Sequence, residues 1–363
     1  MHSRTLFGFF SWAVFFCSVQ GICECGFSVN TATSSSNSTQ VTYANTIESD
    51  FTEIQSDRSD RDWFVLTWNQ TTGYLNKIAE AHNVVYNHAL VNDSETSRGI
   101  NGGDPGVELI VRSTVKDGFV SLGEIRTIRK DIMYGSFRAS VKFTGINGTC
   151  GAFFWYYNAT QEIDIEARSS QINTTDNISN VNLVLHSQES LEAGSDAANT
   201  STFETLPLKF LSYEGFHEYR MDWIPGAVTF FIDGKYVFQM NTNIPTVGGR
   251  LTFNHWSNGN PGWSGGPPLT DATMTVKYMK AYFNSSIPHV MGNFTKGCTD
   301  PTAEKAICKI DDDPAFWITK NGTVAGAGTP PYGPRSSSKR SDVGRTKMSA
   351  WCAVSLVVQF FFV

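Results

Sequence analysis

Short apolar runs separated by turn residues constrain the fold of this chain more than any other feature. The runs are rich in Val, Ile, Phe and Tyr, they are divided by Gly, Asn and Asp, and no long segment repeats with the 3.6-residue period of a helix. Regular short strands with turn signals predict an all-β sandwich or barrel. The expected strands cover residues 107–113, 135–143, 152–157, 162–167, 181–186, 217–223, 228–232, 251–256 and 273–283.

One pair of neighbouring strands carries its own turn signal. Asp233 and Gly234 separate two apolar runs, 230–232 and 236–238, and this dipeptide tolerates the positive φ angles of a type I′ hairpin. A chain of 363 residues has room for two domains, but a single β-sandwich can reach roughly 250 residues. We therefore expect one folded domain over residues 57–284.

The first residues have the layout of a secretory signal peptide. His2 and Arg4 precede an uncharged apolar stretch, 6–17, which is too short to span a bilayer comfortably. The alternative, a buried core helix, would need a polar stripe that the stretch lacks. We expect a signal at 1–23, followed by a Ser/Thr-rich lead-in at 24–56.

The last residues predict a lipid anchor. An apolar tail, 349–363, follows a basic spacer and the small residues Ser336, Ser337 and Ser338, an order typical of a GPI attachment signal. A stop-transfer helix is the alternative. We place the lipid at Ser336, with the next two serines as alternatives, and expect a Cys-containing extension at 285–324, a Gly/Pro/Ser stalk at 325–338 and a removed tail at 339–363.

Cysteine number agrees with an oxidising compartment. Cutting the signal after Cys23 and removing the tail leaves four cysteines. Three connectivities are open. We favour Cys298 with Cys308, which close a short loop, and Cys25 with Cys150.

Glycosylation signals and charge describe the surface. Eleven N-x-[ST] triplets indicate a heavily glycosylated, secreted protein, with most acceptors on loops or solvent-facing positions. They begin at Asn37, Asn69, Asn92, Asn147, Asn158, Asn173, Asn177, Asn199, Asn284, Asn293 and Asn321. A formal net charge of -6 argues against nucleic acid as a partner and allows a neutral ligand.

The segment 161–167 carries the clearest chemical signal. On a strand, Glu162, Asp164 and Glu166 share one face, while Ile163 and Ile165 share the other and can anchor the strand in a core. Three acids in a row are costly for a purely structural strand. Two inclined Glu side chains can reach the roughly 5–5.5 Å separation of a retaining glycosidase, with Asp164 shifting their pKa values. A solvated acidic face or a calcium ligand set is the alternative.

This segment resembles the ExDxE signature of glycoside hydrolase family 16, in its lichenase-like and glucan-remodelling branch, of fungal type. The resemblance runs from about Asp62 to Asn284 through ordered blocks at 124–127, 134–137, 153–154, 216–219, 222–226, 231–234 and 254–259. It implies a concanavalin A-like β-jelly-roll sandwich of two antiparallel sheets with an open substrate cleft.

The resemblance also implies roles for individual residues. Glu162 corresponds to the nucleophile, Glu166 to the general acid and base, and Asp164 to their assisting neighbour. Arg126 resembles the arginine near the nucleophile, with a surface ion pair as the alternative. The substrate-binding set implied is Phe154, His186, Asn254, Trp256 and Trp263; a tryptophan by itself is more often a core residue, and His186 either touches sugar or satisfies a buried polar partner.

These residues together predict a secreted, GPI-anchored, retaining endo-β-glucanase of the outer cell surface or cell wall. It would cleave β-1,3/1,4-type glucans as a monomer without a cofactor; a structural calcium is not predictable from the sequence. A cell-wall glucan transglycosylase is the alternative, because both reactions pass through the same glycosyl-enzyme intermediate. The alternative of another class is a non-catalytic carbohydrate-binding sandwich, which has no need of all three acids.

Overall fold

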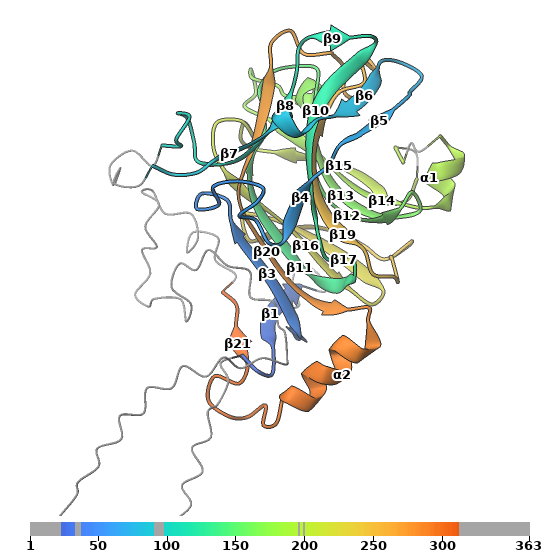
Figure 1. Cartoon of the computed structure of the whole chain (residues 1–363). Helices are drawn as coiled ribbons and strands as arrows, with labels where there is room; N and C mark the ends of the chain where they lie inside the picture. Colours follow the sequence, from blue (N-terminus) through green and yellow to red (C-terminus); the bar gives the residue numbers. More distant parts are fainter. Residues whose placement is uncertain (1–22, 33–37, 91–97, 195–196, 199, 312–363) are drawn as a thin grey trace, which may run out of the picture.

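Alternating apolar and polar side chains build two large sheets that pack face to face in the computed structural model (Figure 1). The structure describes residues 23–32, 38–90, 98–194, 197–198 and 200–311. The nine expected strands are all present, with ends within three residues of the expected bounds. The prediction of an all-β jelly-roll sandwich is confirmed.

The ten-stranded sheet has the order β15-β14-β13-β12-β19-β10-β6-β5, with β4 and β9 also paired to β10. Its strands are β4 (Trp63–Val65), β5 (Trp68–Gln70), β6 (Asn76–Ala79), β9 (Val115–Lys116), β10 (Phe119–Thr127), β12 (Cys150–Asn158), β13 (Gln161–Arg168), β14 (Ser179–His186), β15 (Phe203–Leu208) and β19 (Arg250–Trp256). Strand β6 runs parallel to β10, so this sheet is not wholly antiparallel.

The eight-stranded sheet has the order β18-β17-β16-β11-β20-β8-β7, with β3 paired to β20. Its strands are β3 (Asn45–Asp50), β7 (Val84–Asn87), β8 (Gly106–Val111), β11 (Ile132–Lys142), β16 (His217–Ile224), β17 (Ala227–Ile232), β18 (Lys235–Met240) and β20 (Ala272–Ser285). The predicted hairpin joins β17 to β18, and positive φ angles at Asp233 (48°) and Gly234 (71°) confirm its turn.

One apolar core lies between the two large sheets. Aromatic side chains fill much of it: Phe153 stacks on Phe253 with ring centroids 4.7 Å apart, and Trp155 of one sheet meets Trp223 of the other at 4.6 Å. Large rigid rings of this kind bury much area at small entropic cost. Much of the aromatic content of the chain therefore serves the sandwich core.

Residues 24–56 do not form the expected lead-in. They contain β1 (Phe27–Ala32), β2 (Ser38–Tyr43) and β3, and the first two join β21 (Cys308–Lys309) in a three-stranded sheet. Val29 and Tyr43 pack on Tyr282 of β20, so this small sheet covers the outer face of the eight-stranded sheet. The predicted domain start at residue 57 is therefore wrong.

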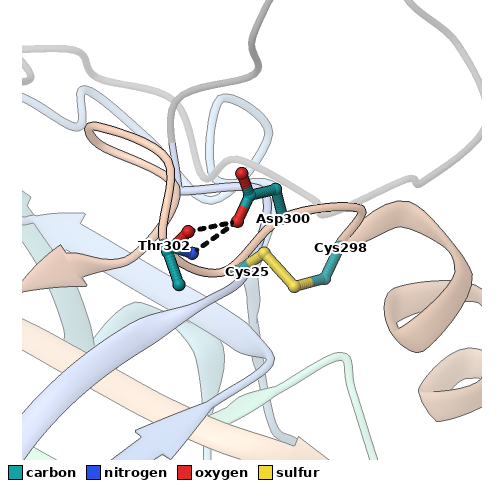
Figure 2. Close-up of a disulfide and its surroundings, with 4 residues drawn as sticks. All are labelled: Cys25, Cys298, Asp300 and Thr302. Carbon is teal, nitrogen blue, oxygen red and sulfur yellow. Dashed lines mark hydrogen bonds between the residues drawn. A yellow bond between two sulfur atoms is a disulfide. The ribbon is translucent and has the colours of Figure 1, made fainter.

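Both favoured disulfides are also wrong. The structure pairs Cys23 with Cys308 and Cys25 with Cys298, and leaves Cys150 as a buried free thiol. Figure 2 shows the second bridge at the end of helix α2 (Pro288–Gly297). The bridge to Cys308 makes Cys23 part of the folded unit, whereas the expected pairing left Cys23 out.

The remaining predictions about the ends lie outside the described residues, which exclude 1–22 and 312–363. These include the secretory signal proper, the stalk, Ser336 and the removed tail. Within the described residues, no helix is long and apolar enough to cross a bilayer. The short elements α1 (Gln188–Glu192), η1 (Ala81–Asn83) and η2 (Ser169–Gln171) complete the fold.

Candidate active site

The three acids of β13 share one face, as the alternation of a strand requires. Ile163 and Ile165 are fully buried in the core, so Glu162, Asp164 and Glu166 lie on the opposite face of the ten-stranded sheet. We call this the carboxylate face. The two glutamates are half-buried, whereas only 4% of Asp164 is exposed.

Burial governs the protonation of these acids. It raises the pKa of Asp164 well above the ordinary range, and the charges of Glu162 and Glu166 add to the rise. Burial also raises the pKa of Glu162, to about 8, although a hydrogen bond with Asp164 opposes that rise. Asp164, which keeps its proton, can donate a hydrogen bond to Glu162 when that carboxyl is ionised, and this contact favours the charged form of Glu162.

Glu166 differs from Glu162 in what surrounds it. Burial raises the pKa of Glu166 to about 7, while a hydrogen bond from Cys150 and the charges of Arg168 and Lys77 act in the opposite direction. Below this pH the carboxyl is protonated and can give a proton away. A pKa near the working pH suits a group that both donates and accepts a proton.

His186 lies directly across from the acids on the next strand. It pairs with Glu162 in the register of β13 and β14, its Nε2 is 3.7 Å from Asp164 Oδ2, and its Nδ1 is 3.2 Å from Ser190 Oγ. The structure therefore brings His186 to the acids and also gives it a polar partner.

Arg126 and Asn254 approach the acids from the other side of β12. Arg126 Nη2 is 3.1 Å from Glu124 Oε1, and its guanidinium lies 5.7 Å from the ring centroid of Tyr156. Tyr156 is the cross-strand neighbour of Glu162. Asn254 Oδ1 is buried and has no hydrogen-bond partner within the described part of the chain, so it can accept from an incoming hydroxyl group.

The two expected sugar-stacking tryptophans each meet a cation. Lys77 Nζ is 4.6 Å from the Trp256 ring centroid, and the Arg168 guanidinium is 4.4 Å from that of Trp263. Both tryptophans are half-buried, so part of each indole remains open. Phe154, the cross-strand neighbour of Asp164, is 7% exposed and lies on the carboxylate face.

The sequence model of Glycosyl hydrolases family 16 matches residues 86–280, which is more than half of the chain and includes the carboxylate face. The chain belongs to this family. It is a glycoside hydrolase by this membership.

The chain is similar in sequence to several bacterial β-glucanases. The β-glucanase of Paenibacillus polymyxa is 27% identical over 58% of this chain and 82% of that enzyme, and the β-glucanase of Bacillus licheniformis is 26% identical over 44% of this chain and 63% of that enzyme. A solved structure of Bacillus licheniformis β-glucanase superposes with a TM-score of 0.49 at 17% identity, over 65% of this chain and 97% of that chain.

Three polar groups of this family 16 site were given no role by the sequence. Glu124 is 2% exposed and accepts a hydrogen bond from Trp68 Nε1 at 3.1 Å in addition to the Arg126 contact. Glu124 and Arg126 are two residues apart on one strand and so share a face, and this spacing is the sequence signal that could have indicated Glu124. Lys77 carries no motif, and Cys150 was assigned to a disulfide, so only the fold places them here.

The acids and His186 are also close enough for a cation to bridge. One ligand atom from each of Glu162, Asp164 and His186 lies within 4.8 Å of the others. Proton sharing between Asp164 and Glu162 explains the same closeness, and we identify none of the three as a metal ligand.

Proposed function

We propose that this family 16 member is a retaining endo-β-glucanase that acts on cell-wall β-glucan. The observation that carries the proposal is the strand β13, where Glu162, Asp164 and Glu166 lie on one face with unlike surroundings. Membership of the family and the β-glucanase relatives support this substrate class.

In the proposed reaction, the Glu162 carboxylate attacks the anomeric carbon while Glu166 gives its proton to the glycosidic oxygen. The glycosidic bond breaks, and the sugar is left covalently attached to Glu162. Glu166, now ionised, takes a proton from water as the water oxygen attacks the anomeric carbon from the face opposite Glu162. The bond between that carbon and the Glu162 oxygen breaks, which frees the sugar and returns Glu162 as a carboxylate and Glu166 as an acid. Asp164 holds its proton toward Glu162 and so favours the charged form of the nucleophile.

Substrate contacts follow from the groups that are open on the carboxylate face. Asn254 Oδ1 and Asp164 Oδ2 are buried and unpartnered by hydrogen bonds within the described residues, so sugar hydroxyl groups can donate to them. The half-buried indoles of Trp256 and Trp263 offer apolar surface to sugar rings. Arg126, Phe154 and His186 complete the proposed binding set.

We also propose an extracellular location with a GPI lipid at Ser336. Two disulfides support an oxidising compartment. Sequon asparagines are exposed at six positions in the described part of the chain, namely Asn69, Asn147, Asn158, Asn173, Asn177 and Asn293. Asn284 differs, because it is half-buried and its Oδ1 accepts from the Ala44 amide at 3.2 Å.

The test uses the purified protein with a panel of β-glucans of different linkage. Glu162→Gln and Glu166→Gln should each lower kcat by at least about 10³-fold while glucan binding remains. The exposed Glu214 gives the matched control, and Glu214→Gln should keep full activity. Retention of the β-anomer in the first product, followed by NMR, would support the covalent intermediate.

Three outcomes would point elsewhere. An α-anomeric first product would rule out retention. Binding without any cleavage or transfer by the unaltered protein would favour a carbohydrate-binding sandwich. A labelled oligosaccharide acceptor distinguishes the transfer reaction, because labelled products longer than the acceptor require a sugar hydroxyl in place of water.

A further inference from the structure

Cys150 is a buried thiol in direct contact with the proposed acid and base. It begins β12, is fully buried, and stands outside both disulfides. In the sheet register it lies opposite Arg168 on one side and Trp256 on the other. Its Sγ is 3.6 Å from Glu166 Oε1, within the range of a sulfur hydrogen bond.

The thiol is the donor in this contact. Burial, followed by the charge of Glu166, raises the pKa of the Cys150 thiol well above its ordinary range, so the sulfur keeps its proton at neutral pH. Within the described part of the chain, it is the one side chain that donates a hydrogen bond to Glu166. A thiol is a weak donor, which suits a carboxyl that must gain and lose a proton in each cycle.

Lys77, on strand β6 of the same sheet, supplies a second, electrostatic interaction with Glu166. Its ammonium lies over the indole of Trp256 at 4.6 Å and that of Trp68 at 5.8 Å. Trp68 is held by its hydrogen bond to Glu124. Lys77 is half-buried and interacts electrostatically with both Glu124 and Glu166, so its charge reaches the acid across β10, β19 and β12.

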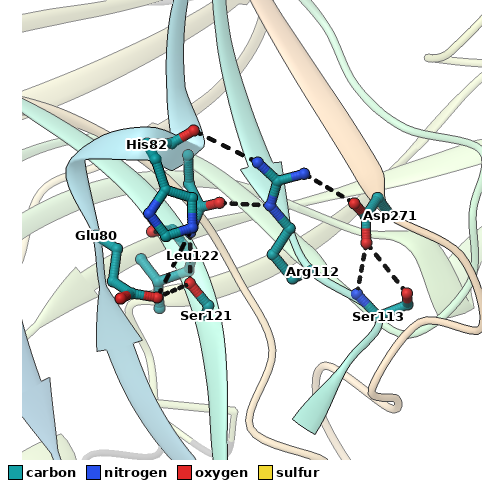
Figure 3. A network of polar contacts seen from close by, with 8 residues as sticks. Glu80, His82, Arg112, Ser113, Ser121, Leu122 and Asp271 are labelled. Carbon is teal, nitrogen blue, oxygen red and sulfur yellow. Dashed lines mark hydrogen bonds and ion pairs between the residues drawn. The ribbon is translucent and has the colours of Figure 1, made fainter. Parts of the chain in front are cut away.

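A polar network holds the residues that directly follow β6, the strand that carries this lysine (Figure 3). Glu80, just after β6, accepts a hydrogen bond from Ser121 of β10. Arg112, just after β8, reaches Asp271 Oδ2 with Nη1 at 2.8 Å and the His82 carbonyl with Nη2 at 3.4 Å. These bonds join the β6 end to β8, β10 and the start of β20, so the lysine stem departs from a fixed strand.

Five further groups face Glu166 from the elements packed against it. Glu162, Asp164 and Arg168 share its strand, Asn182 of β14 lies opposite it, and Ala152 of β12 lies on its other side. Arg168 is held by a hydrogen bond from Nη1 to the Gly262 carbonyl at 3.0 Å and by its position over Trp263.

We propose that Cys150 and Lys77 are positioning residues for Glu166, the thiol orienting the carboxyl by a weak hydrogen bond and the ammonium balancing its charge across Trp256. This inference rests on the proposed role of Glu166. Together the two groups stabilise the Glu166 carboxylate after it has given its proton to the leaving oxygen. Their effect is weak enough that Glu166 still carries its proton at the start of the cycle.

The test measures kcat/KM as a function of pH and compares the alkaline limb of the profile, where activity falls as Glu166 loses its proton. Cys150→Ala removes the donor to the ionised form and should move this limb up by about 0.5 pH unit. Cys150→Ser offers a stronger donor and should move it down by a similar amount. Lys77→Met removes the cation and should move it up, also by about 0.5 pH unit.

Matched controls separate positioning from loss of structure. Lys209 is exposed, and Lys209→Met should leave the limb unmoved. A purely structural role for Cys150 would lower Tm in the variants without opposite shifts of the limb. The proposal is overturned if the limb stays in place in all three variants, or if Ala and Ser at position 150 shift it in the same direction.

Failure of this inference is distinguishable from failure of the proposed function. If Glu166→Ala keeps full activity, Glu166 is not the acid and both proposals fall. If Glu166→Ala is inactive and is rescued by azide, while the Cys150 and Lys77 variants keep the original pH profile, only the positioning inference falls.

Discussion

The two disulfides should contribute to stability in a strongly non-additive way. Cys23 and Cys308 are 285 residues apart, and Cys25 and Cys298 are 273 apart. Either bridge alone closes almost the same long loop in the unfolded chain. Once one is present, the other closes only a small loop of roughly 12 residues, formed by the short segments between the paired cysteines.

The loop-entropy relation converts these lengths into free energies. Removing one bridge, as Cys25→Ala with Cys298→Ala, opens the small loop and should lower the free energy of unfolding by about 3 kcal/mol. Removing the second bridge as well opens the long loop and should lower the free energy of unfolding by a further 5–6 kcal/mol. A loss of this size is comparable to the total stability of many domains. Either single-bridge variant should therefore fold, and the variant without bridges should be largely unfolded at 25 °C.

Urea unfolding of the unaltered protein and the two single-bridge variants under non-reducing conditions, followed by tryptophan fluorescence, measures the first loss. The fluorescence of the variant without bridges in the absence of urea shows whether that variant is already unfolded. The reasoning is refuted if the two bridges contribute equally and additively, because additivity would mean that each closes an independent loop. It is also refuted if peptide mapping of the unaltered protein finds the bridges between other cysteines.

Three further results are expected. Activity against β-glucan should fall as pH rises through about 7, because the pKa of Glu166 is raised by burial and the acid is protonated only below that pH; a kcat/KM profile that stays flat to pH 9 would contradict this role. Phe253→Ala should lower the free energy of unfolding by about 3–5 kcal/mol in urea, since the ring is fully buried against Phe153 and Trp63, and an effect below 1 kcal/mol would contradict that packing. Arg126→Met should destabilise the protein by about 1–3 kcal/mol in the same assay, because Glu124 is left buried without its cation, and Arg126→Lys should recover part of the loss.

The regular part of the fold could be predicted because its information is local. Alternation in each short run decides which side chains face the core, and this pattern is independent of the strand's partners. The hairpin at Asp233 and Gly234 is local too, since only a few residue types accept its φ angles. The strands β1 and β2 were missed because neither contains adjacent apolar residues, and their pairing with each other and packing against β20 override that composition.

The candidate site divides in the same way. Glu162, Asp164 and Glu166 belong to one strand, so their common face follows from the two-residue repeat alone. Lys77, Glu124 and Cys150 come from three other strands, and their closeness to the acids of β13 depends on strand order and register across the sheet. No local pattern carries that order.

The sequence by itself determined the sandwich class, the face that bears the three acids and the chemistry those acids can perform, because each depends on residues within a few positions of one another. Only the tertiary structure decided that Cys23 pairs with Cys308, that Cys150 stays a thiol against Glu166, and that Lys77 reaches the site over Trp256. These contacts join residues far apart in the chain, where burial and sheet register, and not spacing, set which groups meet.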